Sequence, residues 1–395
     1  MTALRDESGH ALRGESGHGG LGGLMMPDWA DWSPSTPYTV GIEEEAMLLD
    51  PENWSLAQRI DDVLPRLPAV LGAQATAETH SAAIELATRP HRTAEGAGRE
   101  LAGLREALAA ELTCCGLRAA SAGTHPFAVW SETLVSSGER YQLVYESMRE
   151  LARREPTFAL HVHIGVADPE DAIVLHNRLR AHLPLLLALS ANSPFWQGRD
   201  TGLASARTPL FQAFPRVGIP RHFASYAEYV ETVDLMLRCE AFPEPTFLWW
   251  DVRPQPRFGT VEVRIMDAQT TGSQAAALVA LVQSIAHLEL TEGYHTDEIF
   301  GGVEVLAENR FLAARDGMDA RLIDPVAEQR VCARELLVRL MRRIRPHAAA
   351  LGCEAVLGPL MALAGQTGAA RQISLAHGPE RLPGLMAQLS DAFLD

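Results

Sequence analysis

The sequence has few cysteines, and none has the spacing that a zinc site or a thiol redox motif requires. Five of the 395 residues are cysteine: Cys114, Cys115, Cys239, Cys332 and Cys353. The one close pair is vicinal, and no CxxC spacing occurs. Such cysteines are typical of reduced thiols in a reducing compartment, so the sequence predicts a cytoplasmic protein.

Positive charge is also scarce. The formal net charge is −16, whereas a protein that binds nucleic acid along a broad surface needs clustered Lys and Arg. Nucleic acid is therefore not an expected partner. A single nucleotide remains compatible with this charge, provided that metal ions neutralise its phosphates and a few arginines lie nearby.

Long apolar runs are missing as well. The longest, at residues 183–189 and 275–282, are shorter than the roughly 20 residues that span a bilayer. The polar N-terminus also lacks the pattern of a signal peptide, so we expect no membrane partner. Residues 1–36 are rich in glycine and have little to bury, which predicts a disordered tail before one folded domain at residues 37–395.

Alternating and helical patterns predict an α+β fold. Strand-like alternation occurs at residues 38–49, 82–88, 157–166 and 259–267. Helical patterns occupy residues 93–115 and the chain after residue 273, and Asp168 followed by Pro169 indicates the start of another helix. This order predicts a mainly antiparallel sheet with helices packed on one face.

Carboxylates are concentrated on the first expected strand. Alternation places Glu43 and Glu45 on one face of this strand and Glu44 on the other. Glu85 lies inside another apolar strand. Acids on a shared face repel one another and are costly to desolvate, so they indicate a cation nearby. A solvated strand end, or a salt bridge in the case of Glu85, is the competing interpretation.

Two imidazoles share a face of a third strand, at His161 and His163. Neutral imidazole is a frequent metal ligand, although one core histidine and one hydrogen-bonded histidine would give the same pattern. The carboxylates favour Mg²⁺ or Mn²⁺ over softer metals.

Arginines gather at residues 250–264, where Arg253, Arg257 and Arg264 accompany Glu262. Glu262 and Arg264 share a strand face, so one could bind a metal and the other a phosphate. A structural ion pair is the alternative. The density of arginine near turns favours an anion site.

Six segments in register resemble the YbdK-type carboxylate-amine ligases, a family also called glutamate-cysteine ligase type 2. These segments are Gly41 to Glu45, Ile84 to Thr88, Gly123 to Phe127, His161 to Gly165, Ser193 to Thr201 and Trp250 to Asp267. The resemblance covers roughly residues 38–390 and implies a glutamine synthetase-like catalytic domain. One departure is Glu44, where many relatives have an apolar residue.

The resemblance also implies metal ligands. Glu45 and Glu85 would hold the metal nearer the acceptor substrate, with Glu78 as a further candidate acid. Glu43, His161 and Glu262 would hold the metal that bridges the ATP phosphates.

The arginines would bind phosphate groups and stabilise the negative charge that develops during the reaction. By the same resemblance, Arg264 and Arg257 would bind the nucleotide and steady the transferring phosphoryl group. Arg199 is a further candidate for nucleotide binding, and Arg253 or Arg199 would stabilise an oxyanion or hold the substrate carboxylate. The segment at residues 193–207 is the expected wall or lid of the substrate site.

The implied activity is an ATP- and Mg²⁺-dependent ligation through an acyl phosphate, with Mn²⁺ as the other metal to consider. L-Glutamate and cysteine would give γ-glutamylcysteine, ADP and phosphate, although the family is regarded as weakly active on that pair and the amine stays open. A homo-oligomer is also implied. The alternatives are a guanidino-kinase-like phosphotransferase, a metal-dependent amide hydrolase and a non-catalytic metal- or amino-acid-binding protein.

Overall fold

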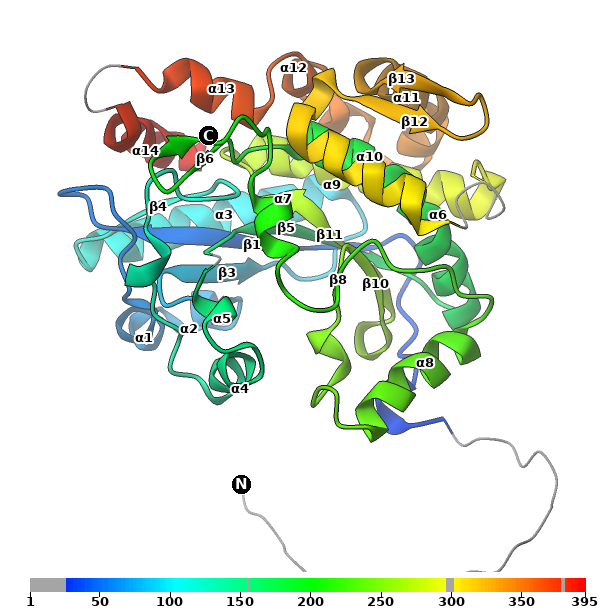
Figure 1. The fold of residues 1–395 in the computed structure, drawn as a ribbon, viewed down its shortest axis with the longest axis horizontal. Helices are drawn as coiled ribbons and strands as arrows, with labels where there is room; N and C mark the ends of the chain where they lie inside the picture. The colour runs from blue at the N-terminus through cyan, green and yellow to red at the C-terminus, as the bar shows by residue number, and fades with distance from the viewer. Residues whose placement is uncertain (1–25, 155, 296–301, 378–380) are drawn as a thin grey trace, which may run out of the picture.

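The computed structural model describes residues 26–154, 156–295, 302–377 and 381–395 and is built on one antiparallel sheet (Figure 1). Its strands are β1 (Val40–Leu49), β2 (Ala75–Ala77), β3 (Ala83–Ala87), β4 (Arg118–Ala120), β5 (Ala159–Gly165), β10 (Val252–Gln255) and β11 (Thr260–Asp267). Their order is β10-β11-β5-β1-β3-β2, with β4 also paired to β1. The earliest strand in the chain therefore lies in the middle of the sheet.

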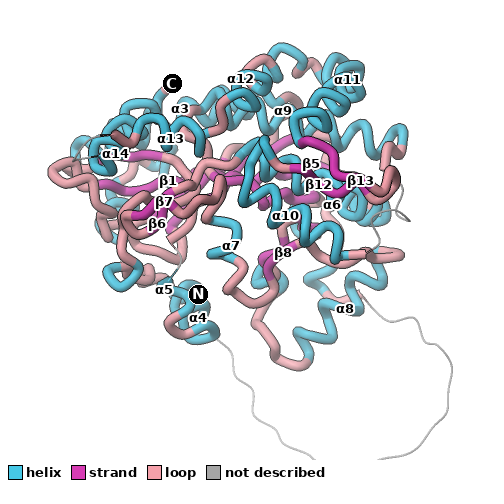
Figure 2. The backbone as a smooth tube through the Cα atoms, turned by 45° about the horizontal axis from the view of Figure 1, so that its top comes forward, coloured by secondary structure: helices cyan, strands magenta, loops and turns pink. Residues whose placement is uncertain are grey.

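Long helices cover one face of the sheet, as the sequence predicted, and most of the core lies between these two layers (Figures 1 and 2). The helices on this side are α3 (Ala94–Cys114), α6 (Pro169–Ser190), α9 (Gly272–Glu292), α10 (Val303–Asp316), α11 (Ala333–Leu351), α12 (Leu360–Gly365), α13 (Gly368–Leu375) and α14 (Arg381–Asp391). Figure 1 places further helices below the sheet, namely α1 (Ile60–Val63), α2 (Ala69–Gly72), α4 (Glu139–Met148), α5 (Leu151–Arg154) and α8 (Tyr226–Arg238), whereas α7 (Arg207–Phe211) overlaps the sheet in this view.

Short strand pairs interrupt the helical and loop segments. They are β6 (Phe195–Trp196) with β7 (Arg199–Asp200), β8 (Val217–Gly218) with β9 (Trp249–Trp250), and β12 (Arg321–Asp324) with β13 (Gln329–Cys332). The β12–β13 hairpin corrects the expectation of a purely helical chain after residue 273. Its turn is favoured because the Asp324 side chain accepts hydrogen bonds from the backbone N–H groups of Val326 and Ala327.

Side-chain caps fix where the long helices begin. The Asp168 carboxylate accepts hydrogen bonds from the N–H groups of Glu170 and Asp171, with Pro169 in the first turn, as the sequence predicted. Helix α9 begins with a capping box formed by Thr271 and Gln274. This helix is longer than the expected apolar run and could span a bilayer by length and composition alone. It is a core helix here, because 72% of its most apolar stretch is buried inside the fold.

A buried ion pair joins the sheet to this helical layer. Glu44 points away from the acids on either side of it, as alternation predicted, and its carboxylate accepts hydrogen bonds of 2.7 and 2.5 Å from Arg105 on α3. Both side chains are almost completely buried. The same guanidinium donates to the backbone oxygens of Gln269, Thr270 and Phe393. The acid between the two site acids is therefore structural.

The packed chain extends beyond the boundary expected at residue 36. Residues 28–36, which we call the N-terminal strap, begin with a 3-10 turn at Asp28–Ala30. The strap is held by a hydrogen bond from the Trp32 indole to Val166 O and by one from the Ser35 hydroxyl to Phe258 O. Gly259, at φ 60°, is required beneath it, since a Cβ there would lie 1.8 Å from Ser33 O. Residues 1–25 of the expected tail lie outside the described residues.

Candidate active site

Strand register brings the predicted acids and histidines together on the face opposite the long helices. Glu45 on β1 lies across from Glu85 on β3, and Glu43 lies across from His161 on β5. On the other side of β5, His163 lies across from Glu262 on β11. Because side chains alternate along a strand, these groups share one face of the sheet, and Glu44 points to the opposite face.

Three carboxylates form the first half of the site. Oxygens of Glu45, Glu78 and Glu85 lie within 4.8 Å of one another. Burial and the neighbouring Glu78 raise the pKa of Glu45 to about 8. Burial and the surrounding acids likewise raise the pKa of Glu85. Three neighbouring carboxylates do not readily ionise together unless a cation balances their charge. Because all the ligand atoms are oxygen, the cluster fits a hard cation such as Mg²⁺ or Mn²⁺.

Two histidines and two carboxylates form the second half. Nδ1 of His161 lies 3.3 Å from Glu43 Oε2 and 3.9 Å from Glu262 Oε1. Nε2 of His163 lies 3.3 Å from Glu43 Oε1 without a hydrogen bond of good geometry. Burial and Arg264 lower the pKa of His161 to about 4, which favours the neutral imidazole that ligates metals.

Arginines surround the second cluster. Nε of Arg253 donates to Glu262 Oε2 at 2.7 Å, and Arg264 donates to Glu262 Oε1. Burial opposes the charge of Glu262, but Arg253 and Arg264 outweigh it and hold the pKa of this carboxyl far below its usual range. Arg264 Nη1 also lies 3.5 Å from His161 Nδ1. The charge of Glu262 is thus already balanced in part by guanidinium groups.

The two clusters open into one cavity of about 380 Å³. Its walls include the three predicted arginines Arg253, Arg257 and Arg264, and aromatic side chains such as Tyr141 on α4 and Trp249 on β9. In Figure 1, α4 lies below the sheet, and β9 is the strand that pairs with β8. The fourth predicted arginine, Arg199, is exposed on β7 and is not among the residues that line the cavity.

Two groups at the site were not assigned a role from the sequence. His163 lies within 4.8 Å of Glu43 and Glu262 as a possible third ligand, and the alternation that revealed His161 also pointed to it. Arg207 lines the cavity beside the acids, with its guanidinium 3.7 Å from Asp267 Oδ1 and donating to Ile265 O. Arg207 lies in a short helix after a loop, and this helix is too short for the spacing of its apolar residues to predict where the Arg207 side chain points.

Comparison with known proteins identifies the family of this chain. The model of the glutamate-cysteine ligase family 2 (GCS2) matches residues 39–382. A provisionally named glutamate-cysteine ligase 2-1 from Rubrobacter xylanophilus is 42% identical over 342 residues, which are 85% of this chain and 89% of that protein.

Solved structures share the fold at low identity. A glutamate-cysteine ligase from Francisella tularensis, crystallised with AMP, has a TM-score of 0.65 and 14% identity over 92% of this chain and 90% of its own. A bifunctional glutathione synthetase from Pasteurella multocida has a TM-score of 0.63 and 15% identity over 89% of this chain and 52% of its own. On the family match and the sequence identity, the chain belongs to the glutamate-cysteine ligase family 2.

Proposed function

We propose that this ATP-dependent carboxylate-amine ligase activates the side-chain carboxylate of L-glutamate and transfers the acyl group to an amine, with cysteine as the first amine to test. A carboxylate and an amine do not condense in water, so the carboxylate oxygen must first become a leaving group. Transfer of the γ-phosphoryl group of ATP gives an acyl phosphate and ADP. Attack by the amine then gives the amide, phosphate and a proton.

The observation that carries the proposal is the pair of acid-rich clusters in one cavity. Glu45, Glu78 and Glu85 would hold one divalent cation. Glu43 and Glu262, with His161 or His163, would hold another. Mg²⁺ or Mn²⁺ in these positions would neutralise the phosphates of ATP during phosphoryl transfer.

The arginines would act on the charge that moves during the reaction. Arg264 donates to Glu262 and lies beside His161, so its guanidinium is held next to the proposed metal ligands and would donate to the γ-phosphoryl oxygens there. Arg257, at the exposed end of the same cavity, would reach the nucleotide from outside. Arg253 is already engaged by Glu262 and by the backbone oxygens of Thr246 and Leu248. We therefore assign Arg253 to holding Glu262 in place.

The test is the release of ADP and phosphate by purified protein with ATP, Mg²⁺ and L-glutamate, measured with and without a panel of amines that includes cysteine. We expect turnover that requires both glutamate and an amine. The variant Glu45→Gln should abolish this turnover, whereas Glu95→Gln, an exposed acid on α3, should leave it unchanged. Phosphate transfer to an amine or guanidine without amide formation would instead identify a phosphotransferase.

A further inference from the structure

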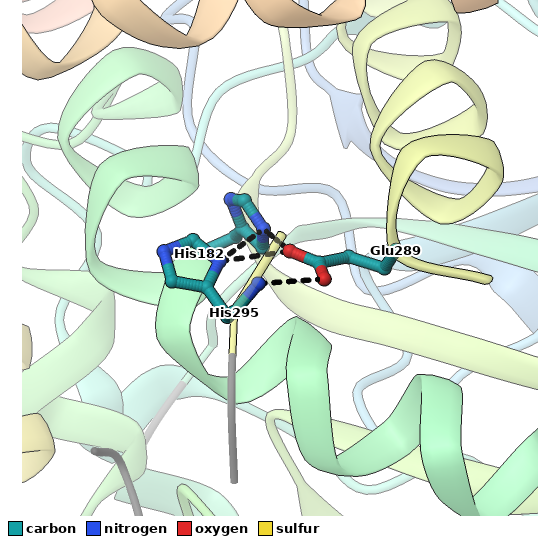
Figure 3. Close-up of side chains that lie close together, drawn as sticks. All are labelled: His182, Glu289 and His295. Carbon is teal, nitrogen blue, oxygen red and sulfur yellow. Dashed lines mark hydrogen bonds and ion pairs between the residues drawn. The ribbon is translucent and has the colours of Figure 1, made fainter. Parts of the chain in front are cut away.

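Two histidines and a glutamate converge on the helical side of the sheet, away from the active site. Figure 3 shows the side chains of His182 on α6, Glu289 on α9 and His295 just beyond α9 pointing toward one another. Glu289 Oε1 lies 2.6 Å from His182 Nε2 and 2.8 Å from His295 Nδ1, and the two ring nitrogens are 3.1 Å apart. Three potential ligand atoms thus meet at one point.

The chain reverses at the end of α9 to complete this cluster. Gly293 ends the helix in the left-handed region, at φ 61°, where a side chain would be strained and would approach the guanidinium of Arg178. The reversal brings the backbone N–H of His295 to within 3.1 Å of Glu289 Oε2. One carboxylate oxygen is therefore used by the backbone, and the other faces both imidazoles.

Burial makes this arrangement costly without a positive charge. The Glu289 side chain is completely buried, and that of His182 is 3% exposed. A bound metal ion would supply that positive charge, since a carboxylate ligates it in the ionised form and an imidazole in the neutral form.

We propose that His182, Glu289 and His295 bind a divalent transition-metal ion, for which Zn²⁺ is the best-matched probe. Two imidazoles and one carboxylate are a ligand set found in zinc sites, with bonds of about 2.0–2.2 Å. Tetrahedral ligands at that distance lie about 3.3 Å apart, so the three atoms would move outward by only a few tenths of an ångström. The nitrogen ligands also favour Zn²⁺ over the Mg²⁺ expected at the active site.

A cavity beside the cluster leaves room for a further ligand. It measures about 330 Å³, and His182, His295, Asn309 and Asp324 are among its lining residues. A water molecule or a small anion in this cavity would complete the coordination of the ion. The ion would link His295, which follows α9, to His182 on α6. This inference does not depend on the substrates proposed above, because the cluster lies on the other side of the sheet.

The first test is Zn²⁺ binding by untagged, chelator-treated, full-length protein in excess Mg²⁺, measured by competition with a chromogenic chelator. The background protein carries Glu45→Gln and Glu85→Gln in one active-site cluster and Glu43→Gln, His161→Asn and His163→Asn in the other, so that neither cluster contributes. We expect one Zn²⁺ per chain, and His295→Ala should weaken its binding by about 100-fold or more. His295 is partly exposed, which makes this substitution mild for folding. Unchanged Zn²⁺ stoichiometry and affinity in His295→Ala would overturn the proposal.

A matched control separates a metal site from a simple hydrogen-bonded pair. His91 is 26% exposed and lies 2.6 Å from the Glu100 carboxylate, much as His295 is 22% exposed and lies 2.8 Å from Glu289. His91→Ala should therefore leave Zn²⁺ binding unchanged. Co²⁺ gives a second readout, because its visible ligand-field bands should appear in the background protein and disappear in both His295→Ala and Glu289→Gln. Retention of these bands in both variants would mean that other residues bind the metal.

Discussion

Every fixed positive charge on the side chains of this protein is a guanidinium, because all 34 of its Lys and Arg residues are arginine. Arginine offers a planar fork of donors that can bind a carboxylate and a phosphate together, whereas an ammonium is a single point of charge. Arg264 uses this capacity, since it donates to Glu262 while lying 3.5 Å from His161 Nδ1. Shape as well as charge should therefore matter at this residue.

The substitution Arg264→Lys is expected to lower kcat/KM by about 100-fold, the usual cost of losing one well-placed donor to transition-state charge. The lysine keeps the charge but cannot contact Glu262 and a phosphoryl oxygen at once. Steady-state phosphate release would measure the effect. Arg199→Lys, on an exposed strand outside the cavity lining, should retain wild-type kinetics, and equal kinetics for both variants would contradict the role given to Arg264.

The site could be predicted from the sequence wherever strand alternation applied. Alternation placed Glu43 with Glu45 and Glu262 with Arg264 on shared strand faces, whereas the choice of Glu43, Glu45, Glu85, His161 and Glu262 as metal ligands came from the family resemblance. The structure brings these five residues to one cavity or its immediate border. Residues in irregular segments could not be placed, because only the tertiary fold decides where a loop side chain points. Glu78 was therefore a weak candidate, and Arg207 was included only as the last residue of the expected wall at residues 193–207, without a role of its own. Their catalytic roles remain predictions.

Among the structural elements, α3 is held to the sheet by charge as well as by packing. Arg105→Met should lower the free energy of unfolding by about 3–5 kcal/mol, because Glu44 would remain buried without its partner. Denaturant unfolding would measure this loss. Arg99→Met, which removes an exposed arginine from the same helix, should change stability by at most about 0.5 kcal/mol. A similar small effect for both variants would show that the Glu44–Arg105 pair is not stabilising.

The first turns of α3 carry a pH-sensitive contact. Burial opposes ionisation of Glu100, but hydrogen bonds from His91, Gln74 and Arg89 outweigh it and lower the pKa of this carboxyl from 4.5 to about 2. Its folded-state pKa is depressed, so the stabilisation is present above about pH 4.5 and is lost as the pH falls toward 2. Glu100→Gln should cost about 1 kcal/mol at pH 7. Unfolding curves of both proteins should converge in acid, and a constant difference down to pH 2 would refute this assignment.

The sequence predicted the long elements better than the short ones. The Asp168 cap and the alternation of β1, β3, β5 and β11 identify elements whose core-facing pattern is long enough to be recognised. Pairs such as β6–β7 and β8–β9 contain only two residues per strand, too few to show a period. Their pairing is set by the surrounding packing.

At the scale of the whole molecule, the N-terminal strap crosses the turn that carries Arg257. Ser33 N donates to Pro256 O at 3.0 Å, and the Ser35 hydroxyl donates to Phe258 O at 2.6 Å. The Trp32 indole adds a hydrogen bond to Val166 O. The strap therefore fixes the backbone on both sides of an arginine that lines the cavity.

Deletion of residues 1–36 should lower the free energy of unfolding by about 2–4 kcal/mol, from the loss of buried apolar surface and hydrogen bonds, and should raise the KM for ATP. Deletion of residues 1–25 is the control, because it leaves the strap intact and should change neither quantity. Thermal unfolding and steady-state kinetics of the two deletions would measure the difference. Indistinguishable results would show that the strap is dispensable.

The central position of β1 has a consequence for synthesis. Glu43 and Glu45 leave the ribosome early, but the strands that flank β1 arrive later and Glu262 comes only with β11. A nascent chain that ends before residue 253 therefore has an acidic strand without Arg253, Arg257 and Arg264 and without β10 and β11 of its sheet. Contacts between residues that are far apart in the sequence form slowly. A sheet with unpaired strand edges is prone to aggregate in the meantime. The proposed catalytic centre can therefore form only after the chain has been made as far as the end of β11.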